Sequence, residues 1–239
     1  MDKVVDIAHV IDKVHDGASI MFGGFLGVGA PLKSIEKIVE KGVKNLTVIS
    51  TVSSFPGGGF DLAPLFANNQ IKKFITTHIG TCPEAVKLYK TGELDVEFYP
   101  MGTWIEKVRA GGAGLGGVIT PTGIGTLVEH GKQKITISGK DYLIELPLRA
   151  EFAFIKGFRA DKIGNVEYRG TALNSNPVVA MAADFTVAEV EEIVPVGEIE
   201  PFRVGTPGIV VKAVVQGASS VEHRQTFEEL WVRSGFLKA

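Results

Sequence analysis

The glycine-rich segment of residues 23–29 is the part of the chain whose residue types best suit binding and catalysis. It reads Gly-Gly-Phe-Leu-Gly-Val-Gly and joins an expected strand at residues 19–23 to an expected helix at residues 32–41. Glycine adopts positive φ and lets the backbone approach a ligand closely. Pro31 suits the first helical position, and the unpaired N–H groups of a helix start favour an anion or a developing oxyanion. We therefore predict a ligand site here, with a simple strand-to-helix turn as the alternative.

Five motifs are spread along the chain. The first, residues 16–31, runs Asp-Gly, two residues, three apolar residues, Gly-Gly-Phe, three residues, Gly, one residue and Pro. The others are His-Ile-Gly-Thr at 78–81, Pro-Met-Gly-Thr at 100–103, Arg-Ala-Gly-Gly-Ala-Gly at 109–114 and Thr-Pro-Thr-Gly at 120–123. Together they resemble the α, or A, subunit of family I coenzyme A transferases. The resemblance spans about residues 4–215 and is greatest to the acetate, butyrate and acetoacetate transferases, whose two subunits are separate polypeptides in bacteria.

This resemblance implies that the chain is half of an enzyme. In the family, a glutamate in a Ser-Glu-Asn-Gly motif of the β subunit attacks the acyl-CoA thioester and passes through a mixed anhydride to a glutamyl-CoA thioester. That motif is absent from this sequence, so the resemblance implies a catalytic glutamate on a partner β subunit, in an α₂β₂ heterotetramer. The implied activity is ping-pong transfer of CoA between short-chain carboxylic acids. CoA is then a substrate carrier, and neither a metal nor a bound cofactor is expected.

The resemblance also assigns residues to the site. Seven loop residues are expected to line the acyl-CoA pocket: Gly23, Gly24, Phe25, Leu26, Gly27, Val28 and Gly29. The substrate pocket is expected to contain His78, Met101 and Gly102. Met101 stands where the acetoacetate-using members carry a glutamine. Because a thioether accepts hydrogen bonds only weakly, we expect Met101 to shift preference away from 3-oxo acids.

Motif context and composition exclude several other functions. Residues 112–117 match the dinucleotide fingerprint by letter, but they follow an expected helix and precede Val-Ile-Thr-Pro, whereas the fingerprint needs a preceding strand and a following helix. The five histidines and the single Cys82 lack metal-ligand spacing. A net charge of −2 argues against a nucleic-acid partner. One cysteine, no secretory signal and no long apolar run indicate a cytoplasmic protein without a membrane span.

Two other functions stay open on the sequence alone. By resemblance, the same general fold also serves sugar-phosphate isomerases and deaminases, which would need their own acid and base residues and a phosphate cradle. The chain could instead be a non-catalytic subunit that only binds CoA thioesters. A neighbouring open reading frame with Ser-Glu-Asn-Gly would favour the transferase over both.

The elements around these motifs predict an α/β fold, with a mostly parallel sheet flanked by helices and β-hairpin additions, which by resemblance is the CoA-transferase/NagB-like fold. Strands expected at residues 19–23, 46–50, 73–77 and 96–99 alternate with helices at 32–41, 83–90 and 103–109, the last capped by Thr103. Ligands bind such sheets beyond the strand C-termini. The glycine loop and the loops at His78 and Met101 are therefore expected to converge on one crevice.

The second half of the chain mixes antiparallel and parallel pieces, expected around the same sheet. Residues 134–137 and 142–146 predict a β-hairpin around the turn 138–141, followed by a strand at 152–156, a helix at 176–182 and a strand at 186–190. The segment from Glu222 is either a C-terminal helix or a partner-binding tail. Since no linker or repeat interrupts the pattern, we expect a single domain over residues 1–239.

Overall fold

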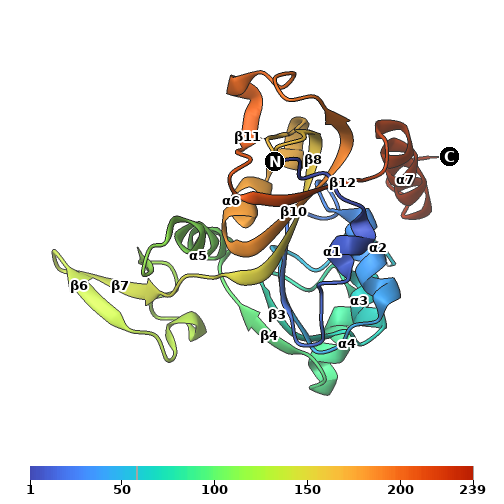
Figure 1. Ribbon diagram of the computed structural model, residues 1–239. Helices are drawn as coiled ribbons and strands as arrows, with labels where there is room; N and C mark the ends of the chain where they lie inside the picture. Colours follow the sequence, from blue (N-terminus) through green and yellow to red (C-terminus); the bar gives the residue numbers. More distant parts are fainter. Residues whose placement is uncertain (58, 239) are drawn as a thin grey trace.

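A central sheet with helices on both faces organises the computed structural model, which describes residues 1–57 and 59–238 (Figure 1). Within that part of the chain the sheet has nine strands, in the order β11-β9-β8-β1-β2-β3-β4, with β10 paired to β8 and β12 to β10. The strands are β1 (Ser19–Phe22), β2 (Leu46–Ile49), β3 (Ile71–Thr76), β4 (Asp95–Phe98), β8 (Ala150–Asp161), β9 (Val166–Glu167), β10 (Ala183–Val194), β11 (Val204–Thr206) and β12 (Val211–Gln216). Only the pairs that involve β9 are antiparallel among these described strands. The predicted mostly parallel α/β fold is confirmed.

The helices form two layers because successive side chains of each strand point to opposite faces of the sheet. Ile20 and Phe22 of β1 belong to an apolar core shared with α1 (Ile7–Ile11), α2 (Leu32–Lys41), α3 (Ala63–Ala67) and α4 (Pro83–Thr91). Met21, between them, belongs to a second core shared with α5 (Met101–Ala113) and α6 (Asn176–Met181). The alternation along β1 thus gives the sheet two separate hydrophobic cores.

Helix ends follow the local signals at α2 and α4 but not at α5. Helix α2 occupies the predicted residues 32–41 and ends at Gly42, whose φ is +73°. Helix α4 likewise ends at Gly92, in the same left-handed conformation. The prediction that Thr103 caps α5 is wrong: the helix begins at Met101 with Pro100 as its N-cap, and Thr103 is buried inside the first turn. Proline suits a helix start because its missing N–H would have no partner there.

The predicted hairpin lies in a sheet of its own, so its expected place in the main sheet is wrong. Strands β6 (Lys134–Ile137) and β7 (Lys140–Glu145) meet at the two-residue turn Ser138-Gly139, where both φ values are positive. Strand β5 (Val118–Thr120), which the sequence did not reveal, pairs with the other edge of β7. Figure 1 shows this three-stranded sheet projecting from the body. A buried ion pair fixes its base: Lys107 Nζ of α5 lies 3.1 Å from Glu145 Oε2.

Strands β8 and β10 each have twelve residues, more than twice the predicted lengths. They pair with each other along almost their whole length. Charged residues beyond the predicted ends, such as Arg159, Asp161 and Glu192, interrupt the apolar pattern from which strand length was predicted. The extension is therefore set by pairing rather than by local hydrophobicity.

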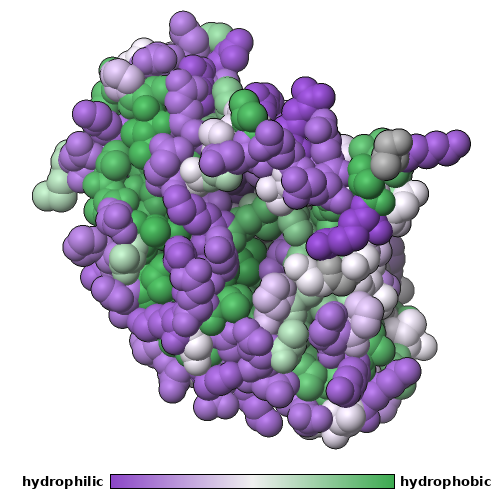
Figure 2. Space-filling model, turned by 90° about the vertical axis from the view of Figure 1, so that its right-hand side faces the viewer, coloured by the Kyte–Doolittle hydropathy of each residue, from purple (hydrophilic) through white to green (hydrophobic). Residues whose placement is uncertain are grey.

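The C-terminal segment is a helix, α7 (Ser220–Arg233), and not an extended tail. Ser219 and Glu222 form a capping box, with the Ser219 Oγ accepting from the Glu222 N–H and the Glu222 carboxylate accepting from the Ser219 N–H. Phe227 and Leu230 pack on Phe60. Figure 2 views the side of the molecule that carries α7 and shows apolar side chains gathered in a hollow between polar surfaces. Over the described residues, no helix has the length and apolar character needed to span a bilayer.

Candidate active site

The glycine-rich loop leaves the C-terminal end of β1 and folds into a compact turn. Phe25 and Val28 exchange two backbone hydrogen bonds of 3.0 Å, and the Ala30 N–H donates to the Gly27 carbonyl. Gly24, Gly27 and Gly29 all have positive φ, and Leu26 shares this left-handed conformation at +50°. The turn is thus held by its own backbone, and the side chain of Phe25 is exposed at its tip.

Three consecutive polar residues, at positions 174–176, hydrogen-bond to the backbone of this loop. The Asn174 amide donates to the Val28 carbonyl at 2.9 Å, and the buried Asn176 amide donates to the Gly29 carbonyl at 3.0 Å. The Ser175 hydroxyl accepts from the Gly24 N–H at 3.2 Å. Because buried backbone groups need partners, residues 174–176 determine the shape of the loop.

Close approach of these residues explains two of the glycines. A Cβ at Gly23 would lie 1.9 Å from Asn176 Oδ1, and a Cβ at Gly29 would lie 2.8 Å from the Ala172 carbonyl oxygen. Packing of the chain on itself therefore requires glycine at both positions. Acyl-CoA binding by the seven loop residues stays a prediction. Packing alone accounts for the glycines at positions 23 and 29.

The start of helix α2 is closed to external anions, which corrects one expectation. The Glu189 carboxylate of β10 accepts from the Lys33 N–H at 3.2 Å, from the Ser34 N–H at 2.8 Å and from the Ser34 hydroxyl at 2.7 Å. Burial raises the pKa of Glu189, against the opposing effect of these donors. A carboxylate does bind at this helix start, but it belongs to the chain itself.

The start of helix α5 is open by comparison. Its N-cap, Pro100, makes no side-chain hydrogen bond, and its first turn carries no acidic residue. Met101 is 45% exposed, and a Cβ added at Gly102 would meet nothing within 4 Å. Of the starts of α2 and α5, that of α5 is therefore the one open to an anion.

The predicted site residues lie in order along one edge of the sheet. The Thr51 hydroxyl after β2 donates to the Gly24 carbonyl at 3.0 Å, and the Thr77 hydroxyl after β3 donates to the Thr51 carbonyl at 2.6 Å. The next strand joins through the Tyr99 N–H, which donates to the Thr76 carbonyl. This edge carries the glycine loop, the exposed His78 and Met101, in the strand order β1, β3 and β4.

These residues share an edge but not one enclosed crevice. The small cavity beneath the loop is lined by residues 22–27 together with Ser50, Val52, Asp61 and Leu62, and neither His78 nor Met101 borders it. The paired strands β2 and β3 separate the glycine loop from Met101. In this chain the expected convergence is therefore limited to a common edge.

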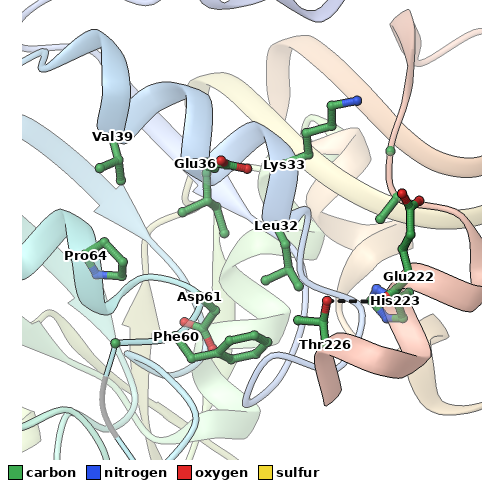
Figure 3. Close-up of a pocket in the computed structure, with 14 residues that line it drawn as sticks. Leu32, Lys33, Glu36, Val39, Phe60, Asp61, Pro64, Glu222, His223 and Thr226 are labelled. Atoms are coloured by element: carbon green, nitrogen blue, oxygen red, sulfur yellow. Dashed lines mark hydrogen bonds between the residues drawn. The ribbon is translucent and has the colours of Figure 1, made fainter. Parts of the chain in front are cut away.

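Asp61 is a buried carboxyl group next to the loop. A Cβ at Gly27 would lie 3.6 Å from Asp61 Oδ2. Its carboxylate accepts from the N–H groups of Phe55 and Leu62, while burial raises its pKa to about 7. Asp61 also borders a cavity of about 480 Å³, around which Leu32, Phe60 and Thr226 come from three separate segments (Figure 3).

Comparison with known proteins decides the family. The coenzyme A transferase family model matches residues 4–217. The chain belongs to the coenzyme A transferase family. It is 46% identical to the acetate CoA-transferase subunit alpha of Escherichia coli (strain K12), over 91% of this chain and 98% of that protein. It is 44% identical to the acetoacetyl-CoA:acetate/butyrate CoA transferase alpha subunit of Clostridium acetobutylicum, over 90% of this chain and 97% of that protein.

These relatives confirm the resemblance to an α subunit. A solved acyl-CoA transferase from Escherichia coli O157:H7, in thioester complex with CoA, superposes with a TM-score of 0.81 at 21% identity. The match covers 90% of this chain and 47% of that one, so the chain spans about half its length. At this identity the likeness shows the fold alone.

In the part of this coenzyme A transferase chain that the structure describes, there is neither a reactive thiol nor a cluster of metal-binding side chains. Cys82 is buried, and burial raises the pKa of its thiol to about 11, so it packs rather than reacts. Across residues 1–57 and 59–238, no three His, Cys, Asp or Glu side chains are placed to hold a metal ion.

The sequence did not predict five residues that contact or neighbour the predicted site of this transferase chain: Asn174, Ser175, Asn176, Glu189 and Asp61. The polar run before Pro177 was a weak signal, since Asn and Ser commonly begin helices. For Glu189 and Asp61 the sequence carries no signal, because Glu189 contacts residues that are distant in the sequence and Asp61 is distinguished only by its burial.

Proposed function

We propose that this chain is the α subunit of a short-chain acyl-CoA:carboxylate CoA-transferase that works with a β subunit in an α₂β₂ assembly in the cytoplasm. The observation that carries the proposal is the near full-length identity to two α subunits, of an acetate and of an acetoacetyl-CoA:acetate/butyrate transferase. The absence of a Ser-Glu-Asn-Gly motif from the chain supports a separate catalytic subunit. Neither the isomerase nor the binding-only alternative gains a supporting observation.

The proposed reaction proceeds in two halves. The partner's glutamate attacks the thioester carbonyl and releases CoA thiolate, which then attacks the glutamyl carbonyl of the mixed anhydride and releases the first acid. A second acid then takes the CoA by the reverse steps. A carboxylate nucleophile needs positioning and oxyanion donors, and we assign the loop of residues 23–29 to that work.

Labelling of the partner tests this function. The chain is pulled down from its native extract, incubated with acetyl-CoA or butyryl-CoA, treated with borohydride and examined by intact mass. We expect a second subunit of similar size whose glutamate carries the acyl-CoA-dependent modification. A chain that comes alone, stays unmodified and turns over a sugar phosphate would show that the fold was interpreted correctly and the function was not.

Substrate preference is expected to depend on Met101. In Met101→Gln, turnover of acetoacetate relative to butyrate should rise about tenfold, because one added hydrogen bond to the keto oxygen, which butyrate lacks, contributes roughly 1.5 kcal/mol. The ratio is measured with both acids competing for the same acyl-CoA. Met181→Gln is the matched control, since Met181 has a similar exposure of 43% on a different helix. An unchanged ratio in Met101→Gln contradicts the prediction.

A further inference from the structure

Helix α7 packs beside the glycine loop but lies outside the residues matched to the family. The match ends at residue 217, and α7 begins at Ser220. The match to the acetate CoA-transferase subunit alpha of Escherichia coli already covers 98% of that protein, which leaves no room for a counterpart of this 14-residue helix. This chain therefore carries next to its predicted site a helix that the relative does not have.

One aromatic cluster forms the apolar attachment of α7 to the body of the molecule. Phe227 and Leu230 of the helix are buried there with Phe60, and the partly buried Trp231 and Val28 of the glycine loop pack against them. Two cavities, of about 480 and 620 Å³, border α7 next to this cluster, and the larger also borders the loop at Val28. Because side chains that line a cavity lose packing partners on that side, the cluster is where α7 is held most closely.

The Phe60 ring connects this cluster to the glycine loop. Its centre lies 5.4 Å from the centre of the Phe227 ring, in an edge-to-face arrangement. Figure 3 shows Phe60 close to Thr226 of the same helix. Phe60 also touches the loop, since a Cβ added at Gly27 would lie 2.4 Å from Phe60 Cε1. Phe60 is 9% exposed, and close-packed side chains transmit strain, so a push on its ring from Gly27 reaches Phe227.

We propose that Phe227 and Phe60 are positioning residues for the glycine loop, and that the docked helix α7 holds this loop in one conformation. The coupling is reciprocal: a change at Gly27 loosens α7, and release of α7 frees Phe60 and with it the loop. A loop that is fixed before its ligand arrives binds that ligand without an ordering cost. The effect on acyl-CoA rests on the proposed function, whereas the coupling of loop and helix does not.

Acrylamide quenching of tryptophan fluorescence in the folded full-length protein tests the coupling. Of the two tryptophans, Trp104 is fully buried, so quenching reports Trp231 of α7. In Gly27→Ala we expect the quenching constant to rise at least about twofold, because the new Cβ displaces Phe60 and opens the helix locally. Gly42→Ala is the matched control: its φ of +73° is close to the +80° of Gly27, but a Cβ there meets nothing within 4 Å. Unchanged quenching in Gly27→Ala, or an equal rise in both variants, overturns the inference.

Transfer kinetics with the β subunit test the positioning role. Phe227→Ala should raise the KM for acetyl-CoA about tenfold, because the loop is no longer held in place. Phe227→Leu should restore most of the affinity, and Val221→Ala, at an exposed position of the same helix, should leave KM unchanged. A merely unfolded fraction would lower kcat at constant KM, and that result overturns the positioning role. Quenching needs neither acyl-CoA nor a partner, so a coupling found without any transfer activity supports the inference while the proposed function fails.

Discussion

Gly23→Ala is expected to lower the free energy of unfolding by about 1–3 kcal/mol and to reduce CoA transfer at least about a hundredfold. The added Cβ would lie 1.9 Å from Asn176 Oδ1, so the two groups must move apart. Asn176 is fully buried and also holds the Gly29 carbonyl and the Lys156 N–H. Its displacement therefore disturbs both ends of the glycine loop. The loss of activity follows if this loop positions the acyl-CoA.

Two measurements check this expectation. Urea unfolding gives the stability, and steady-state transfer from acetyl-CoA with the β subunit present gives the activity. Gly116→Ala is the matched control, because a Cβ there meets nothing within 4 Å and Gly116 does not have a positive φ. That variant should stay within about 0.5 kcal/mol of the wild type. Full activity in a folded Gly23→Ala enzyme would contradict the role given to the loop.

The ionisation of Asp61 is expected to make the protein less stable as the pH rises. Its pKa is about 7 in the folded chain because of burial, against 3.8 when unperturbed. Between these values the folded state holds a proton that the unfolded state has lost, so the free energy of unfolding falls with increasing pH. The destabilisation is complete above about pH 7 and amounts to about 4 kcal/mol at most, at 1.36 kcal/mol per unit.

Asp61→Asn should remove this dependence, since an amide does not titrate in this range. The free energies of unfolding of the wild type and the variant are compared by urea denaturation from about pH 4 to about pH 8. Glu189 is present in both proteins, so its own titration cancels in the comparison. Asp12→Asn serves as the control, because Asp12 is exposed at the end of α1. Parallel curves for wild type and Asp61→Asn would show that Asp61 does not titrate as expected.

Local patterns were sufficient where neighbours in the sequence determine the structure. Pro31 and Gly42 bound helix α2 at the predicted residues, and the apolar residues of β1 place that strand between two helical layers. The loop motif at residues 16–31 and the four later motifs predicted the family, which the match over residues 4–217 confirmed. The sequence by itself thus determined the fold class, the family and the edge of the sheet that carries the predicted site residues.

Tertiary structure alone decided what the site residues contact. Glu189 closes the start of α2 from 155 positions away in the chain, and Ser175 reaches Gly24 across 151 positions. No local pattern encodes such contacts, because they arise only when β10 lies against the start of α2 and the start of α6 lies against the loop after β1. The same holds for α7, whose residue pattern gave no sign that this helix borders a cavity beside the glycine loop. Periodicity and turn chemistry act over a few residues, whereas burial and hydrogen bonding at this site join segments that meet only in the folded chain.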